Sequence, residues 1–213
     1  MSRGETENQG ARRRYHHGNL REALVKAALD LISRKGPAGF TFADAARAAG
    51  VSPAAPYRHY KDRDALLLDV AQQGFEAFAR ALESAWDGGK PNPRESFDRL
   101  GRAYLHFART QTAYYVAMFE SGLSATDHPE MVIEGNRAFG ILCAATEAVL
   151  ESIPVERRPP AQLMALHIWS VAHGIASLFA RGDRARHPIP ITPEEVLETA
   201  THFYLNGVGV PGK

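Results

Sequence analysis

The stretch TFADAARAAGVSPAAPYRHY, residues 41–60, decides how the N-terminal part of this chain folds. Its residue pattern predicts two short helices joined by a tight turn. Thr41 can cap the first helix, with Asp44 in the position of the reciprocal acid of a capping box. Ser52 can cap the second helix, whose first position is Pro53, where a missing N–H costs little. This pattern predicts a helix-turn-helix, the unit that places its second helix in the major groove of DNA.

Two details of the connection bear on this prediction. Gly50 can adopt the positive φ that ends the first helix. Pro56 removes the first hydrogen bond inside the second helix, to the carbonyl of Ser52, but it lies early enough to be tolerated. We therefore expect a second short helix, beginning at Pro53, that ends in exposed polar side chains.

The side chains of this stretch divide into two sets by their expected role on DNA. Small residues at the start of the second helix can read thymine methyl groups or groove shape; these are Ser52, Ala54 and Ala55. Polar side chains around them can contact phosphates; these are Thr41, Tyr57, Arg58, His59, Lys61 and Arg63. The pattern alone leaves open a helical hairpin that does not contact DNA.

Five short motifs follow one another in this region: Phe40-Thr41, Ala45-Ala46, Ala49-Gly50-Val51-Ser52, Tyr57-Arg58-His59-Tyr60 and Asp64-Ala65-Leu66-Leu67. In this order they resemble the DNA-binding domain of the TetR family of bacterial transcriptional regulators, over residues 15–67. Arg63 stands where the family usually carries lysine, so a planar guanidinium with several donors replaces a compact ammonium group. A shorter match, Ile168-Trp169 followed by Ala172-His173-Gly174, resembles the Trp…His-Gly signature of one C-terminal ligand-domain subclass.

Charge is distributed unevenly along the chain. Residues 1–65 contain 12 Lys and Arg and 7 Asp and Glu, a net charge of +5, whereas residues 66–213 carry −4, giving +1 in total. A basic N-terminal third on an acidic remainder is typical of a nucleic-acid-binding module joined to a second function. Residues 1–14 include three consecutive arginines and read as a disordered basic arm. This arm is either a solvated tail or a contact to DNA.

Helical periodicity continues through the rest of the chain, and no run is typical of a strand. The sequence predicts an all-α protein of about nine helices. We divide it into the arm over 1–14, a helix-turn-helix DNA-binding domain over 15–65, and a ligand-binding and dimerisation domain over 66–213. A continuous fourth helix, from Asp62 to about Trp86, is expected to join the two domains without a linker, so that movement of one is coupled to the other.

The segment Ala161–Ala180 contains no Asp, Glu, Lys or Arg. It is long enough to span a bilayer, but it carries polar residues and stands alone, so we expect no membrane span. On a soluble monomer it would form a large apolar patch. A homodimer through the helices 161–180 and 193–205 would cover this patch as a four-helix bundle, which the family resemblance also implies. Complete burial within one chain is the alternative. The last helix is expected to face inward through Val196, Ala200, Phe203 and Tyr204.

The family resemblance also implies a small-molecule pocket in the C-terminal domain. Its candidate lining residues are mostly aromatic: Tyr104, Phe107, Tyr115, Phe119, Phe139, Cys143, Trp169 and His173. Each can equally be ordinary core packing, since helical cores use aromatic residues at helical spacing. A cleft with few polar groups would take an apolar or aromatic ligand, whose identity the sequence does not give.

The sequence shows no pattern typical of an enzyme, a metal site or a cofactor site. Cys143, the single cysteine, lies in an alanine-rich helix without a nearby base. His167 and His173 are six positions apart, on different faces of one helix, which argues against a shared metal. We expect no catalytic residues, no metal and no cofactor. The lone cysteine and the lack of an N-terminal apolar segment favour a cytoplasmic location.

These observations predict a homodimeric, ligand-responsive DNA-binding transcriptional regulator. We expect a repressor that binds a near-palindromic operator in double-stranded DNA and is released when a ligand shifts the fourth helix. The competing hypothesis is a small-molecule-binding or catalytic helical protein whose helix-turn-helix is only structural.

Overall fold

The computed structural model describes residues 20–124, 128–180 and 190–210. These residues form eight α-helices and three short 3-10 helices, and none of them lies in a β-strand. The protein is therefore all-α, as the sequence predicts, with a helix count close to the expected nine. The proposed arm over residues 1–14 lies outside the described residues.

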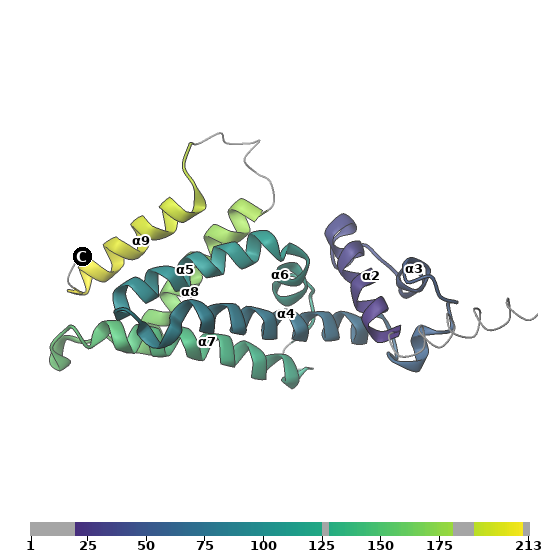
Figure 1. Cartoon of the computed structure of the whole chain (residues 1–213), viewed down its shortest axis with the longest axis horizontal. Coiled ribbons are helices and arrows are strands. Elements are labelled where there is room, and N and C mark those ends of the chain that lie inside the picture. The colour runs from purple at the N-terminus through teal and green to yellow at the C-terminus, as the bar shows by residue number, and fades with distance from the viewer. Residues whose placement is uncertain (1–19, 125–127, 181–189, 211–213) are drawn as a thin grey trace, which may run out of the picture.

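Figure 1 shows a small N-terminal part and a larger body, joined by one long helix. The small part contains α2 (Leu20–Lys35), α3 (Phe42–Ala48) and the 3-10 helix η1 (Pro56–Arg58). The body contains α5 (Pro93–Thr110), α6 (Thr112–Phe119), α7 (Pro129–Leu150), α8 (Ala161–Ala180) and α9 (Pro193–Gly207), with the 3-10 helices η2 (Asp87–Gly89) and η3 (Val155–Arg157). The joining helix is α4 (Arg63–Trp86), which belongs to both parts.

Helix α4 is continuous over 24 residues, as predicted. It begins where the Asp62 carboxylate accepts a hydrogen bond from the backbone N–H of Ala65 at 2.8 Å, which satisfies a donor at the helix start. Its buried side recurs at helical spacing through residues Leu66, Leu67, Asp69, Val70, Ala71, Gly74, Phe75, Phe78, Ala79 and Leu82. Its first turns pack on α2 and the remainder packs on α5, α6 and α7. One apolar helix face therefore supports both parts of the molecule.

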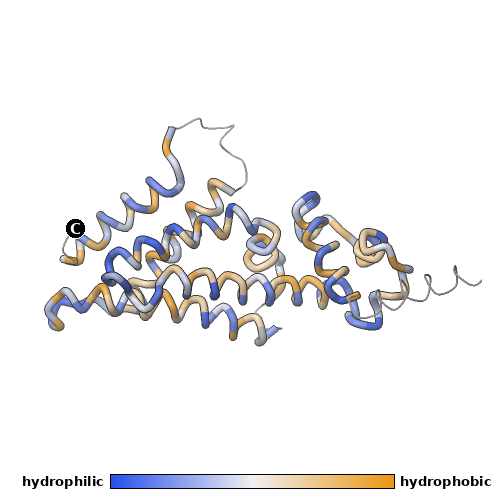
Figure 2. Tube along the Cα trace, in the orientation of Figure 1, coloured by the Kyte–Doolittle hydropathy of each residue, from blue (hydrophilic) through white to orange (hydrophobic). Residues whose placement is uncertain are grey.

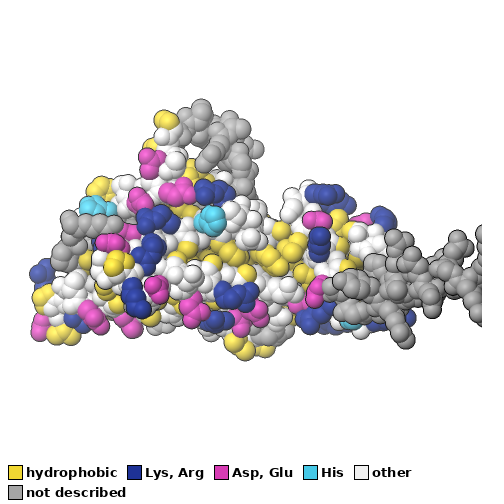
Figure 3. All heavy atoms as spheres, viewed as in Figure 1, with side chains coloured by type: hydrophobic (Ala, Val, Ile, Leu, Met, Phe, Trp, Pro, Cys, Tyr) yellow, Lys and Arg dark blue, Asp and Glu magenta, His cyan; other side chains and the backbone are white. Residues whose placement is uncertain are grey.

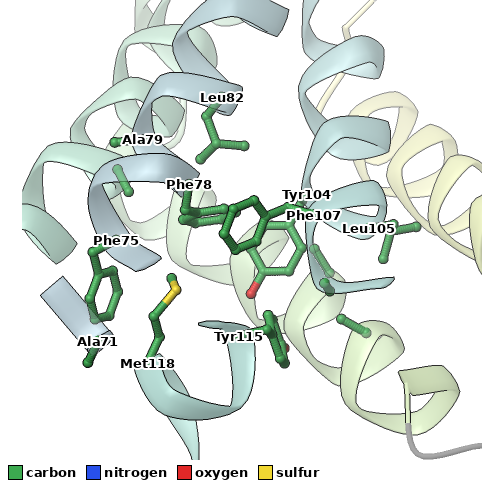
Figure 4. Close-up of a cluster of buried hydrophobic side chains, with 14 of the residues drawn as sticks. Ala71, Phe75, Phe78, Ala79, Leu82, Tyr104, Leu105, Phe107, Tyr115 and Met118 are labelled. Carbon is green, nitrogen blue, oxygen red and sulfur yellow. The ribbon is translucent and has the colours of Figure 1, made fainter. Parts of the chain in front are cut away.

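Phe78 lies at the centre of the body core, with 1% of its surface exposed. Its ring centroid is 5.1 Å from those of Tyr104 and Phe107 on α5 and 6.5 Å from that of Phe119 on α6. Figure 4 shows this aromatic cluster between α4, α5 and α6, with Phe75 and Met118 beside it. Figure 2 shows polar residues recurring on the outer sides of the same helices. The core is thus built from large rings that interlock across three helices.

The second helix of the predicted helix-turn-helix is not an α-helix, and this expectation is wrong. Residues 53–55 form a turn, followed by η1. Ser52 does not cap it, since no side-chain hydrogen bond closes the start of η1. Pro53 and Pro56 lack backbone N–H groups, so the Ser52 carbonyl accepts instead from the N–H of Ala55, at 3.0 Å. That three-residue spacing closes a tight turn in place of an α-helical one.

The last helix begins as predicted but faces a different way. The Thr192 hydroxyl and the Glu195 carboxylate form both halves of a capping box. The buried positions of α9 are Pro193, Leu197, Thr201 and Leu205, whereas 71% of the Phe203 surface is exposed. The expectation that Phe203 faces inward is therefore wrong, because the side chains of Leu197, Thr201 and Leu205, four residues apart, define the inner face.

Complete burial of α8 within one chain is also wrong. Exposed apolar side chains line one side of this helix: Leu163 (50% exposed), Leu166 (52%), Val171 (39%) and Leu178 (67%). Among the described helices, α8 has the length and mean hydropathy of a membrane span over Ala161–Phe179. One such helix is weak support for a span, because core helices of soluble proteins share these properties.

Candidate DNA-binding surface and ligand pocket

The first helix of the helix-turn-helix is fixed by the predicted capping box. The Thr41 hydroxyl accepts from the N–H of Asp44 at 3.1 Å, and the Asp44 carboxylate accepts from the N–H of Thr41 at 3.0 Å. These bonds from the backbone and the hydroxyl of Thr41 lower the pKa of Asp44. Gly50 has φ +70° directly after this helix, as predicted. The local geometry therefore holds α3 at a defined angle to the turn that follows.

The structure places most of the predicted DNA-contacting residues on one exposed segment. Ser52, Ala54, Tyr57, Arg58, His59 and Lys61 are exposed, and Ala55 is half-buried. Pro56 and Tyr60 are buried and hold the segment against the rest of the small part. The Tyr57 ring is 63% exposed and packs edge-on against Phe42, with 5.0 Å between centroids. The base-reading and phosphate-contacting candidates thus lie side by side along residues 52–61.

Arg63 is positioned differently from the other basic candidates. Its guanidinium donates to the Pro37 carbonyl and, at 3.0 Å, to the Asp64 carboxylate. It also lies 5.3 Å from the centre of the Phe40 ring, and 29% of the side chain is exposed. Arg63 therefore ties the start of α4 to the loop before α3, which leaves Arg58 and Lys61 as the more accessible cations.

Charged side chains of both signs cover the two parts of the molecule. Figure 3 shows Lys and Arg side chains with some Asp and Glu on the small part, and Lys and Arg interspersed with Asp and Glu on the body. Several body arginines are paired across helices: Arg102 with Glu198 at 2.8 Å and Arg109 with Glu194 at 2.9 Å. The local charge thus favours the small part as the contact to a polyanion.

A buried carboxylate on α4 was not anticipated from the sequence. Asp69, on α4, accepts hydrogen bonds from Arg21 on α2, from the Tyr60 hydroxyl and from Gln73. Burial alone raises the pKa of Asp69, but these three donors outweigh it and hold the pKa below its ordinary value. The one signal in the sequence is an aspartate at a core-facing position of an otherwise apolar helix face.

The body contains a pocket of about 360 Å³ between α4, α6, α7 and α8, a volume within the range of small-molecule sites. Its walls are Phe75, Met118, Phe119, Leu123, Met131, Val132, Gly135, Asn136, Phe139, Leu166 and Trp169. Three of the eight predicted lining residues are among them: Phe119, Phe139 and Trp169. The wall contains no charged side chain, and Asn136 is its one polar side chain.

Three other predicted residues form a hydrogen-bonded cluster behind the pocket wall. The hydroxyls of Tyr104 and Tyr115 each lie 2.9 Å from Nδ1 of His173. Burial raises the pKa of both tyrosines, and burial lowers the pKa of His173, an effect that Glu120 opposes. The cluster is therefore uncharged near neutral pH. Phe119 links it to the pocket, since its ring packs 4.9 Å from that of His173.

The last two predicted lining residues, Phe107 and Cys143, lie elsewhere. Phe107 is buried against Phe78 in the core. Cys143 is half-buried on α7, and burial raises the pKa of its thiol, which makes it a poor nucleophile. Within residues 20–124, 128–180 and 190–210, no three His, Cys, Asp or Glu side chains are grouped to hold a metal ion.

The fold and the exposed segment define a helix-turn-helix DNA-binding protein with a separate helical body. Residues 24–70 match the family model "Bacterial regulatory proteins, tetR family", and residues 97–204 match the model "Tetracyclin repressor-like, C-terminal domain". The chain belongs to the TetR family of bacterial regulatory proteins. It is a DNA-binding transcriptional regulator and not an enzyme.

Solved structures share this fold over nearly the whole chain. A protein of unknown function from Rhodococcus sp. RHA1 is 29% identical, with a TM-score of 0.76, covering 91% of this chain and 97% of that one. The regulator PfmR from Thermus thermophilus is 22% identical, with a TM-score of 0.68 and coverages of 86% and 97%. The fatty acid degradation regulator FadR from Bacillus halodurans is 13% identical, with a TM-score of 0.71 and coverages of 90% and 97%. The latter two show the fold alone. No curated protein matches the chain.

The half-buried His173 predicts a pH dependence of stability. Because folding holds the pKa of His173 below its ordinary 6.5, the unfolded chain binds this proton more readily. Stability from this residue is complete above about pH 6.5 and is lost as the pH falls below it, by at most about 1.4 kcal/mol per pH unit. Urea unfolding at pH 7.5, 6.5 and 5.5 should therefore show a steeper loss in the wild type than in His173→Asn. His202→Asn, at an exposed histidine, is the control and should keep the wild-type slope; a wild-type slope in His173→Asn would contradict the assignment.

Proposed function

We propose that this regulator is a homodimeric repressor that binds a near-palindromic operator and releases it when a small apolar or aromatic ligand enters the body. The exposed segment 52–61 carries the first half of this proposal, since it gathers small residues and free cations on one surface. We keep the sequence division into a DNA-binding domain over 15–65 and a ligand-binding and dimerisation domain over 66–213. A cytoplasmic location follows from a function on DNA in bacteria.

On the operator, Ser52, Ala54 and Ala55 would face the base edges. Their small side chains fit close approach and contact with thymine methyl groups better than hydrogen-bonded readout. Phosphates would be held by Arg58 and Lys61, together with Thr41, Tyr57, His59 and, more weakly because of its internal bonds, Arg63. One such surface covers few base pairs, so two copies on half-sites about one helical turn apart would supply the specificity.

Arg58→Ala tests the DNA-binding surface. Loss of one phosphate contact should weaken binding to specific and scrambled duplexes by a similar factor and lower the slope of log K against log salt by about 1. The measurement is fluorescence anisotropy at several salt concentrations, with an operator obtained by selection from random duplexes. Arg157→Ala, which removes the same charge from the exposed η3 of the body, is the matched control and should bind like the wild type. Unchanged affinity and slope in Arg58→Ala would overturn this role.

The dimer would form through the exposed apolar sides of α8 and α9. Leu163, Leu166, Val171 and Leu178 lie along α8, and Phe203 extends from α9. Such a row of apolar side chains on two adjacent helices is typical of a surface that pairs with its symmetry mate. Pairing four helices in this way would bury the apolar row and set the distance between the two DNA-binding surfaces.

Leu178→Glu tests this interface. A charge introduced into an apolar contact should shift the protein from dimer to monomer at micromolar concentration and weaken operator binding by about tenfold or more. Sedimentation velocity gives the oligomeric state. Ile133→Glu is the matched control, because Ile133 on α7 is also 67% exposed but lies outside the proposed interface. A Leu178→Glu protein that stays dimeric would contradict the interface.

The pocket wall favours an uncharged ligand. A carboxylate or phosphate buried there would find no cationic side chain among the lining residues, which makes a charged headgroup costly. Asn136 can both accept and donate hydrogen bonds, and the rest of the wall is aromatic, aliphatic or thioether. Phe75 belongs to α4, so a ligand in contact with it acts directly on the helix that carries the DNA-binding part. If the ligand binds the protein more tightly with α4 in one position than in another, it shifts α4 toward that position, and the operator would then be released.

Gly135→Leu tests the pocket. A Cβ at Gly135 would lie 3.7 Å from the Phe75 ring, an ordinary contact, so the rest of the leucine would extend toward the cavity. The affinity for Nile red, an uncharged apolar dye, should fall about tenfold or more, measured by its fluorescence. Gly140→Leu makes the same change on the same helix at an open, exposed position and should leave dye binding unchanged. Equal dye affinity in both variants would locate the dye elsewhere.

A further inference from the structure

Among the residues that the structure describes, Asp69 is the one charged residue that is buried, with 6% of its surface exposed. A buried carboxylate is costly unless donors surround it, and removing one partner leaves the charge uncompensated. Asp69 sits on α4 just beyond the point where this helix leaves the small part. A carboxylate that must be surrounded by hydrogen-bond donors therefore lies at the junction between the two parts of the molecule.

Three segments supply the donors to this carboxylate. Arg21, at the start of α2, donates from Nε to Oδ2 at 2.8 Å and from its terminal nitrogen to Oδ1 at 2.9 Å. The Tyr60 hydroxyl lies near the end of the exposed segment 52–61, called below the DNA-facing segment after its proposed role, and it donates to Oδ2. Gln73 donates to Oδ1 at 3.0 Å from the next turn of α4. Each carboxylate oxygen thus accepts two hydrogen bonds. We refer to Arg21, Tyr60 and Asp69 as the junction clamp.

The body reaches the clamp through α6. Tyr114 lies close enough for the Asp69 charge to raise its pKa further, after burial, and α6 also packs on α2. At Gly74, one turn after Asp69, an added Cβ would lie 2.9 Å from Met118 and 3.2 Å from Tyr114. α6 therefore approaches α4 closely beside the clamp, and the small part, α4 and the body meet there.

Apolar contacts and a bidentate ion pair constrain a helix junction differently. Buried side chains such as Leu24 and Val70 supply free energy through contacts that are not directional. A planar guanidinium bound through two nitrogens to one carboxylate fixes distance and angle together. Since Tyr60 binds the same carboxylate, the DNA-facing segment and α2 are both oriented relative to one point on α4.

We propose that the junction clamp sets the angle of the DNA-binding part on α4 and thereby selects the spacing between operator half-sites. This inference rests on the proposed dimeric, operator-binding function. In a dimer held together through the body, any freedom at this junction would let the two DNA-facing segments adopt several separations. A rigid junction restricts them to one, so Asp69 acts as a positioning residue for spacing specificity without touching DNA.

A half-site spacing series measures this property. The full-length protein is bound to duplexes that carry the selected operator at its optimal spacing and with one base pair inserted or removed between half-sites. The wild type should lose about tenfold or more in affinity away from the optimum. Asp69→Asn, which keeps the side-chain shape but breaks the ion pair, should bind the optimum about fivefold more weakly and show less than about a threefold preference.

Glu76→Gln is the matched control. It removes one carboxylate from the same helix at an exposed position, where Glu76 pairs only with Arg80 one turn away in the described contacts, at 3.4 Å. It should keep the wild-type affinity and spacing preference. The affinity ratio between spacings is insensitive to the folded fraction, so a purely structural loss in Asp69→Asn would lower all affinities and leave the ratio unchanged.

Two outcomes would overturn the proposal. One is a folded Asp69→Asn protein that retains the wild-type ratio between spacings. The other is an Arg21→Gln protein that keeps this ratio but loses about one unit of salt slope, which would make Arg21 a phosphate contact. If Asp69→Asn does not unfold cooperatively, Tyr60→Phe and Arg21→Gln carry the same test. A wild type that binds none of the duplexes would instead refute the proposed function.

Discussion

The apolar face of α4 is the constraint on which the other elements depend. Its buried residues continue from Leu66 to Leu82 without a gap wider than one helical turn, so one helix face serves both the small part and the body. α2 packs on its start, and α5, α6 and α7 pack on the remainder. Close-packed contacts along a whole helix resist local bending, since any bend opens a void. A continuous and closely packed helix therefore joins Phe75, in the pocket wall, to the small part of the molecule.

Two polar clusters join helices in this fold. Asp69 joins α2 to α4, and His173 joins α5 and α6 to α8 through two tyrosines. In both places the apolar surroundings strengthen the hydrogen bonds and make an unpaired group costly. Apolar packing supplies the stability of this fold, and these directional bonds choose among the arrangements that packing alone would permit.

Local signals in the sequence were sufficient for most of the fold. The capping box at Thr41 could be predicted because both of its partners lie within three residues of each other. η1 was mistaken for an α-helix because the helical pattern overlaps Pro56, whose missing N–H decides the geometry. Asp69 was missed because its main partner is 48 positions away in the chain. Some of the predicted aromatic residues, such as Trp169, line the pocket. Helical spacing alone does not distinguish a residue that lines a pocket from one that is packed in the core.

The two prolines of the exposed segment 52–61 have a thermodynamic consequence. Pro53 and Pro56 restrict the backbone before DNA is present, and the buried Tyr60 fixes the end of the segment. Little chain entropy then remains to be lost on complex formation, so the association would show a smaller unfavourable conformational entropy than that of a segment that folds on its target.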